Sequence, residues 1–216
     1  MILNSAKTSW VDTSSSKPQL STLRSKLKEA TMASHTEIES NPTLAKLTSP
    51  SLTESDYKFI LSRYFGFFSP LEAQLRERGA ANLVPDFEMR VRAPRLFKDL
   101  RALGLSETDI AGLQTCNALP SVESDSKKMG VMYVTEGSTL GGMLIAKHLR
   151  TMPFFNEENG HFFTENPQSV SARWKAFIEK LESSAGSLNE AETLKSATET
   201  FDKLDAWMSA DPNSGR

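Results

Sequence analysis

The amino-acid sequence predicts an all-α fold in a single domain, and three observations lead to that class. Apolar residues recur at three- and four-residue intervals along most of the chain, as on one face of a helix. The longest such run, from Asp125 to Leu149, contains no proline. No segment shows the sustained alternation of polar and apolar residues that is typical of a half-buried strand. The chain has 216 residues, 38% of them hydrophobic, which is enough for one sizeable core.

We divide the chain into a helical domain and two tails. Residues 1–19 are rich in Ser, Thr and Lys and show no periodicity, so we expect a mobile N-terminal tail there. The helical domain is predicted to occupy residues 20–209, and residues 210–216 to form a short C-terminal tail.

The first helices are predicted from capping residues and apolar spacing. An amphipathic helix covers residues 22–40. Pro42, with Asn41 as its cap, then begins a short helix. A capping signal at residues 53–56 precedes a core helix that reaches about Leu75. This helix carries four clustered aromatic residues, which we assign mainly to the core and in smaller part to a pocket wall: Tyr64, Phe65, Phe67 and Phe68.

The second half of the domain is predicted to contain five further helices. The last of them follows a capping box at residues 187–190. The predicted helices cover residues 90–103, 107–113, 125–149, 168–184 and about 190–208.

Composition excludes several classes of function. A net charge of −2 and a pI near 6.0 argue against a nucleic-acid-binding protein. We expect no membrane partner and a cytoplasmic location, because no apolar run has the length of a membrane helix and the first residues lack the apolar core of a secretory signal. The single Cys116 cannot form an internal disulfide, and no P-loop, Gly-x-Gly-x-x-Gly or Cys-x-x-Cys motif occurs.

The long helix carries an unusual number of glycines. Each glycine costs a helix interior about 1 kcal/mol relative to alanine, so their presence requires a close approach to the backbone. Tyr133, Gly137 and Gly141 are four residues apart and form one stripe, while Ser138 and Gly142 form the adjacent one. Either a packed neighbouring helix or a flat ligand explains this bare face, and the spacing alone does not decide between them.

The chain has only three histidines, and one of them has a suggestive neighbour. His161 follows a polar turn, and His148 lies in the last turn of a helix, where positive charge is favourable. His35 lies beside the apolar stripe of the first helix, with Glu39 one turn further on. A carboxylate at this spacing can hold one ring nitrogen and leave the other free as a metal ligand. A lone helical histidine is nevertheless more often structural.

Taken together, the two features resemble the haem oxygenase family. The resemblance is carried by residues 27–39 (LKEATMASHTEIE), similar to the family's proximal-helix motif, and by residues 133–142 (YVTEGSTLGG), similar to its distal-helix motif in bacterial form. The similarity extends over roughly residues 21–208. It implies a helical bundle with haem held between a proximal and a distal helix, and it is greatest to the haem oxygenases that bacteria keep beside bacteriophytochromes.

The resemblance also implies roles for individual residues. His35 becomes the iron ligand and Glu39 its hydrogen-bonding partner. Gly137, Gly141 and Gly142 bring the distal backbone to the haem face, and Ser138 helps to order water there. The remaining implied haem contacts are Lys28 and Tyr133 at the propionates, Lys175 as a looser candidate for the same role, and Phe201 as a pocket wall.

One position departs from the mammalian pattern. Where mammalian-type members place an aspartate in the distal helix, this chain has Ser138, as other bacterial members also lack the acid. The implied catalytic group is therefore Gly137, Ser138 and Gly141, with proton delivery left open.

The activity implied by the resemblance is cleavage of haem b at a meso carbon to biliverdin, CO and free iron. Haem is then both substrate and cofactor, with O2 as co-substrate. Electrons would come from an external donor such as ferredoxin or a reductase, and a bacteriophytochrome is an expected partner. The alternatives are a haem carrier or sensor on the same fold, a di-iron bundle, which the Glu–His spacing disfavours, and a purely structural bundle.

Overall fold

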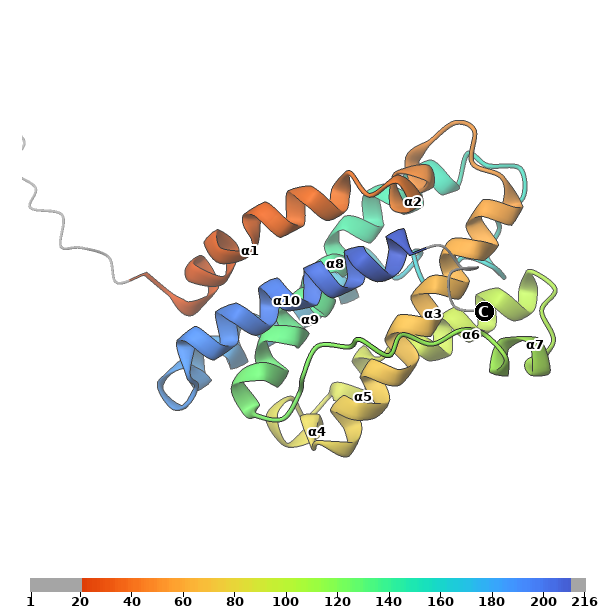
Figure 1. Ribbon diagram of the computed structural model, residues 1–216. Helices are drawn as coiled ribbons and strands as arrows, with labels where there is room; N and C mark the ends of the chain where they lie inside the picture. Colours follow the sequence, from red (N-terminus) through yellow and green to blue (C-terminus); the bar gives the residue numbers. More distant parts are fainter. Residues whose placement is uncertain (1–20, 211–216) are drawn as a thin grey trace, which may run out of the picture.

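The computed structural model describes residues 21–210, and all regular structure in that range is helical (Figure 1). The all-α prediction is therefore confirmed. The predicted tail at residues 1–19 lies outside the described residues, as does the C-terminal tail beyond residue 210.

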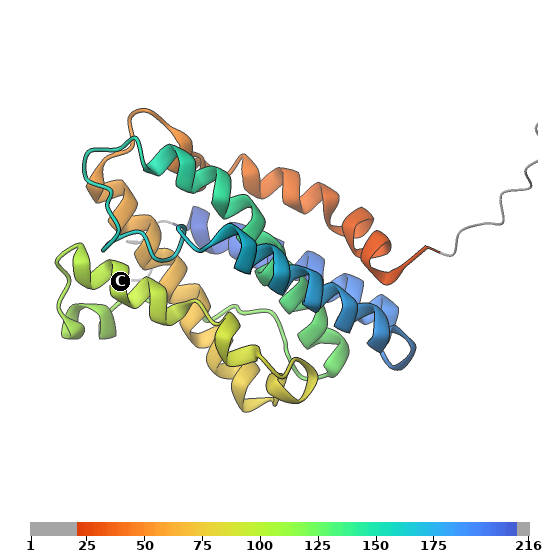
Figure 2. The same cartoon turned by 180° about the vertical axis from the view of Figure 1, so that it is seen from behind.

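Four long helices form one side of the molecule, with α10 lying against both α1 and α8 (Figures 1 and 2). Leu27 of α1, Met132 of α8 and Leu204 of α10 belong to the same buried cluster. The first and the last of the described helices therefore pack together. The helices are α1 (Leu23–Glu39), α8 (Asp125–Leu149), α9 (Pro167–Ser184) and α10 (Glu190–Ser209).

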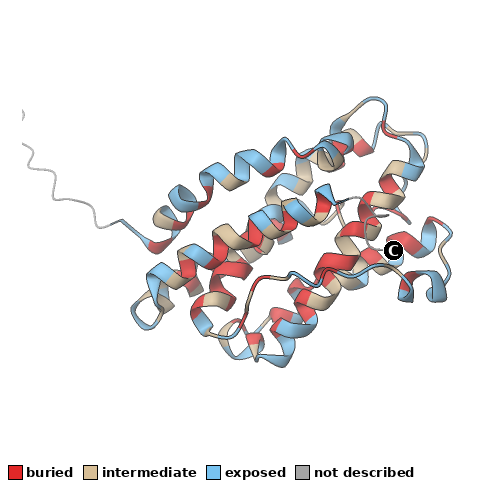
Figure 3. Cartoon of the chain, viewed as in Figure 1, coloured by how far each residue is buried: buried red, intermediate tan, exposed pale blue. Residues whose placement is uncertain are grey.

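The other side is built on the pair α3 (Glu54–Glu77) and α6 (Ala93–Ala102), which meet through a second buried cluster. Burial is concentrated on the faces that the helices turn toward one another (Figure 3). Short elements lie between the long helices along the chain: α2 (Pro42–Ala45), the 3-10 helix η1 (Lys46–Thr48), α4 (Ala80–Leu83), α5 (Phe87–Arg90) and α7 (Glu107–Ala111).

Helix starts agree with the capping residues read from the sequence. Asn41 accepts hydrogen bonds from the main-chain N–H groups of Thr43 and Leu44, so it caps α2 as predicted. Thr53 and Asp56 form a reciprocal capping box at the start of α3. The predicted helix at residues 125–149 has the same bounds as α8.

One predicted helix and one predicted capping residue were wrong. The predicted helix at residues 90–103 is interrupted, because Val91 is extended and α6 begins only at Ala93. The carboxylate of Glu72 accepts hydrogen bonds from the N–H groups of Arg92 and Ala93 and thereby starts α6. The last helix is capped by Asn189 rather than by Ser187, which ends the 3-10 helix η2 (Ala185–Ser187).

Pro70 lies inside α3 and removes the helical partner of the Gly66 carbonyl. That carbonyl accepts a hydrogen bond from Cys116 N–H at 2.9 Å instead. A Cβ atom on Gly66 would overlap the main-chain oxygen of Gln114. The pair Gly66 and Pro70 thus lets the connection between α7 and α8 cross α3 in close contact.

Among residues 21–210, no helix combines the length and the apolar character that crossing a membrane requires.

Candidate functional site

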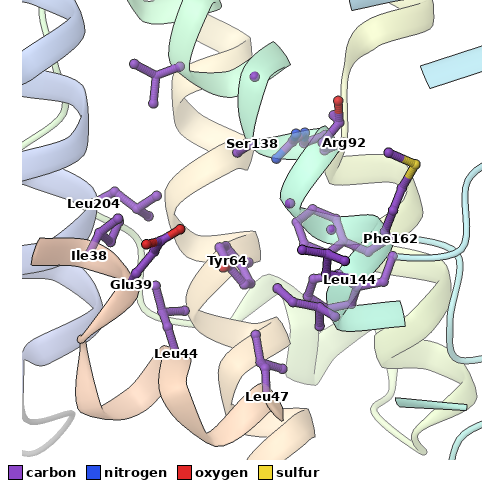
Figure 4. Close-up of a pocket in the computed structure, with 18 of the residues that line it drawn as sticks. Ile38, Glu39, Leu44, Leu47, Tyr64, Arg92, Ser138, Leu144, Phe162 and Leu204 are labelled. Carbon is purple, nitrogen blue, oxygen red and sulfur yellow. The ribbon is translucent and has the colours of Figure 1, made fainter. Parts of the chain in front are cut away.

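A cavity of about 330 Å³ opens between α1, α3, α8 and α10. Its volume lies at the lower end of the range for small-molecule sites. Glu39 of α1, Ser138 of α8 and Tyr64 of α3 lie at three different parts of its wall (Figure 4). Much of the wall is apolar, with contributions from Ile38, Leu44, Leu47, Phe68, Val134, Ile145, Phe163, Val170, Phe201 and Leu204.

On the α1 side, the imidazole of His35 lines the cavity. Its Nδ1 lies 3.5 Å from Oε1 of Glu39, one helical turn away, so the contact leaves Nε2 free. The ring meets Phe201 of α10 edge-on, with 5.5 Å between centroids. Both His35 and Glu39 are exposed, at 56% and 66% of their side-chain area. A half-open imidazole with one nitrogen oriented by a carboxylate is suited to binding a metal in a ligand.

On the α8 side, Gly141 borders open space rather than another helix. A Cβ atom on Gly141 would meet no atom within 4 Å, and one on Gly142 would lie 3.7 Å from Phe163. A Cβ on Gly137 would make ordinary contact with Trp174 at 3.5 Å. The question that the spacing left open is therefore answered for Gly141, which no neighbouring helix approaches.

Ser138 is exposed on the same helix and lines the cavity. Its hydroxyl donates a hydrogen bond to the Thr135 carbonyl at 2.9 Å. The hydroxyl hydrogen is thereby engaged, and the oxygen lone pairs remain able to accept a hydrogen bond from water.

Three residues that the sequence assigned to the site do not line the cavity. Lys28 is exposed on α1. Lys175 is exposed on α9, with its Nζ 3.9 Å from Glu179. Tyr133 packs on Trp174 with 5.5 Å between ring centroids, and burial raises the pKa of its phenol.

The structure adds wall residues that sequence reasoning missed. Tyr64 and Phe68 come from the aromatic cluster that we assigned mainly to the core, and burial raises the pKa of Tyr64 to about 12. Phe162 packs on Tyr64 with 5.0 Å between centroids. It follows α8 in a segment without helical periodicity, so no sequence signal marked it. Arg92 and Arg95 belong to the predicted helix at residues 90–103, and neither was predicted as a site residue from the sequence. Both line the cavity.

Glu165 joins two arginines at the cavity edge. One carboxylate oxygen lies 2.5 Å from Arg95, and the other pairs with Arg173. Burial alone would raise the pKa of Glu165, but the hydrogen bonds from Arg173 and Arg95 hold it below its usual value. The carboxylate therefore stays ionised and neutralises Arg95 locally.

The other two histidines serve elsewhere. His148 Nε2 lies 3.1 Å from the Ser49 carbonyl oxygen, which ties the end of α8 to the segment before α3. His161 pairs through Nδ1 with the fully buried Asp99 at 2.8 Å. Of the three histidines, only His35 lines this cavity.

One histidine and the glycine face of α8 line the same apolar cavity in this all-helical chain. This arrangement is typical of helical proteins that bind a flat, metal-containing ligand. Comparison with known proteins gives the family. The family described as heme oxygenase matches residues 21–210. The chain belongs to the haem oxygenase family, and it is accordingly an enzyme that degrades haem to biliverdin, CO and iron.

Individual relatives agree with this assignment. A heme oxygenase of Xanthomonas campestris pv. campestris (strain 8004) is 32% identical over 126 residues, which cover 58% of this chain and 72% of that protein.

Two solved structures share the fold. The heme oxygenase of Neisseria meningitidis, solved with NO and CO, has a TM-score of 0.70 at 22% identity, over 89% of this chain and 95% of that one. The heme oxygenase of Leptospira interrogans has a TM-score of 0.71 at 19% identity, over 88% and 99%.

Proposed function

We propose that the cavity binds haem b with His35 as the iron ligand and the glycine face of α8 on the other side of the ring. The observation that carries this proposal is that His35 and Gly141 line one apolar cavity, the first with a free Nε2 and the second with no atom near its missing Cβ. Bound haem supplies the iron at which O2 is activated and the ring carbon that is oxidised.

The residues around the haem have separate tasks in this proposal. Glu39 accepts a hydrogen bond from the Nδ1–H of His35 when haem is bound, which keeps the proton on Nδ1 and leaves Nε2 able to bind iron. Gly141 leaves space beside the main chain of α8 for the ring and a small gas, and Gly137 lines the same cavity one turn earlier, beside Trp174. Ser138 holds a water molecule through its free lone pairs. Phe201 keeps the imidazole ring in place by edge-on contact.

Lys28, Tyr133 and Lys175 are proposed to meet the haem propionates. None of them lines the cavity, so contact requires movement of the side chain or projection of the propionates beyond the wall. Both lysines are exposed and have long flexible stems, which makes such movement inexpensive.

Electrons are proposed to come from an external donor such as ferredoxin or a reductase, because the sequence contains no dinucleotide-binding fingerprint. A cytoplasmic location would give access to such carriers. A role in supplying a bacteriophytochrome with its chromophore belongs to the same proposal and rests on the sequence resemblance.

The test is a haemin titration followed by reduction in air. We expect a saturable one-to-one Soret band that decays into the broad red absorption of a bilin. His35→Ala should lose the spectrum of a histidine-ligated haem and most turnover, and added imidazole should restore part of both. His148→Ala is the matched control, since His148 lies outside the cavity.

An unchanged spectrum in His35→Ala would exclude His35 as the ligand. A Soret band in the unaltered protein that persists under reduction would instead indicate a carrier or sensor.

A further inference from the structure

Arg92 is a buried cation at the wall of the haem cavity. The residue is 7% exposed, and it lies between two aromatic rings. Its guanidinium carbon is 4.8 Å from the ring centroid of Phe68 and 5.5 Å from that of Phe162. Burying a charge in this way costs free energy unless a partner neutralises it.

No carboxylate among residues 21–210 lies within ion-pair distance of the Arg92 guanidinium, although the charges of Glu136, Glu72 and Glu165 act on it from farther away. Its guanidinium makes one protein hydrogen bond there, from Nη2 to the Thr135 carbonyl at 2.5 Å, and no ion pair. Glu72 binds the main-chain N–H of Arg92, not its side chain. Burial accordingly lowers the pKa of Arg92.

Neighbouring arginines show the contrast. Arg90 is equally buried, but it pairs with Asp86 at 2.8 Å and with Glu136 at 2.6 Å. Arg95 lines the same cavity as Arg92, and it pairs with Glu165 at 2.5 Å. Arg92 differs from both because its guanidinium makes no ion pair with a carboxylate of the described residues. Its remaining N–H groups are able to donate hydrogen bonds to a bound ligand.

The position of Arg92 indicates which part of the cavity that charge serves. The Thr135 carbonyl accepts hydrogen bonds from both Arg92 and Ser138. Arg92 and Ser138 accordingly lie together on the α8 side of the cavity (Figure 4). Because the Ser138 hydroxyl already donates to that carbonyl, Ser138 is left as an acceptor on this side, and Arg92 is the cationic donor.

We propose that Arg92 forms a site for a small anion beside Ser138, on the glycine side of the haem cavity, with the Arg92 guanidinium donating charge-assisted hydrogen bonds to the anion. The occupant is small, because the haem takes most of the space. This inference rests on the proposed function, since the anion is bound next to the haem. Arg92 would then supply the charged group on this side of the cavity, where α8 itself has the uncharged Ser138.

The alternative is that Arg92 has only a structural role, in which its guanidinium holds α8 by the hydrogen bond to the Thr135 carbonyl. A neutral donor could do the same at a lower desolvation cost. The anion site requires the positive charge of Arg92, whereas the structural role requires only a hydrogen-bond donor to the Thr135 carbonyl.

Azide and CO separate these readings, since azide is an anion that binds ferric haem and CO is a neutral ligand of ferrous haem. The variant Arg92→Gln removes the charge and keeps an amide donor for Thr135. We expect it to weaken azide binding about tenfold or more, with CO affinity changed less than about threefold. Arg92→Lys, which keeps the charge, should retain azide affinity within about threefold. Arg95→Gln is the comparison variant, and we expect azide affinity to change less than about threefold because Glu165 already neutralises that charge.

Each outcome has one meaning. Equal azide affinity in Arg92→Gln and the unaltered protein would overturn the inference, as would an equal loss in Arg95→Gln or a parallel loss of CO affinity. If Arg92→Gln does not bind haem, the Arg92→Lys variant decides, and loss of azide affinity in it would overturn the role of the charge. Failure of the unaltered protein to form a saturable Soret band would contradict the proposed function instead.

Discussion

The two halves of α8 use glycine for opposite purposes. In the amino half, a Cβ atom on Gly130 would overlap the Thr193 carbonyl and lie 2.9 Å from the Ser196 Cβ and 3.0 Å from the Ala197 nitrogen, all in α10. In the carboxyl half, a Cβ on Gly141 would meet nothing within 4 Å. Gly130 is buried, whereas Gly141 is exposed beside the cavity.

This difference shows that one residue type in one helix can meet two different requirements. At Gly130 the missing side chain allows two helices to approach, and the benefit is realised in the folded protein itself. At Gly141 the missing side chain borders open space, in which the proposed haem would lie. Substitution should therefore change stability at the first position and ligand binding at the second.

The largest effect is expected for Gly130→Ala. The added methyl group would force α10 away from α8, which we expect to lower the free energy of unfolding by about 2–3 kcal/mol. The melting temperature, followed by circular dichroism, should fall by roughly 4–12 °C. Gly141→Ala is the control and should raise the free energy of unfolding by about 0.5–1 kcal/mol, because alanine is the better helix former. A Gly130→Ala variant as stable as the unaltered protein would remove the distinction between the halves.

The second effect concerns ligand binding without loss of stability. Gly141→Leu places a side chain in the open space beside α8 and should lower haem affinity by about tenfold or more, which corresponds to about 1.4 kcal/mol. The melting temperature of the haem-free protein should not fall, since no neighbouring atom is displaced. A haemin titration measures the affinity. Unchanged haem affinity would show that the ring does not approach Gly141.

The smallest effect is a pH dependence on the cavity side. The pKa of Glu165 is lowered in the folded protein, so its ion pairs add stability above the unfolded pKa of about 4.3 and lose it as pH falls through the folded pKa. Glu165→Gln should be less stable than the unaltered protein at pH 7, and the difference should shrink below about pH 4. Urea denaturation midpoints from pH 3 to pH 7 measure this. A difference that does not vary with pH would contradict an ionised Glu165.

Local patterns predicted the elements whose causes are local. The bounds of α8 follow from an uninterrupted apolar run, and the starts of α2 and α3 follow from Asn41 and Thr53, whose side chains cap the helices within three residues. His35 and Glu39 were found for the same reason, since an i, i+4 pair is visible in any helical sequence.

The features that were missed depend on residues distant in the chain. The break before α6 is set by Glu72, 20 residues earlier, which no local pattern reveals. Arg92 belongs to the cavity only because that break turns it toward Thr135, 43 residues later. Phe162 is positioned by Asp99, which binds its main-chain N–H across 63 residues. Gly130 was not singled out, because its partner is α10, which lies beyond the reach of any local periodicity.

The packing of α10 between α1 and α8 also bears on how the protein is made. Phe201 and Leu204 line the cavity from the last helix, while His35 lines it from the first. During synthesis α1 therefore emerges from the ribosome well before α10, so the part of the wall that α10 supplies is added after the other described helices. A partly synthesised chain exposes His35 without the aromatic ring that orients it. On the proposed function, a chain that lacks α10 offers haem an incomplete pocket, because the apolar wall from Phe201 and Leu204 is missing.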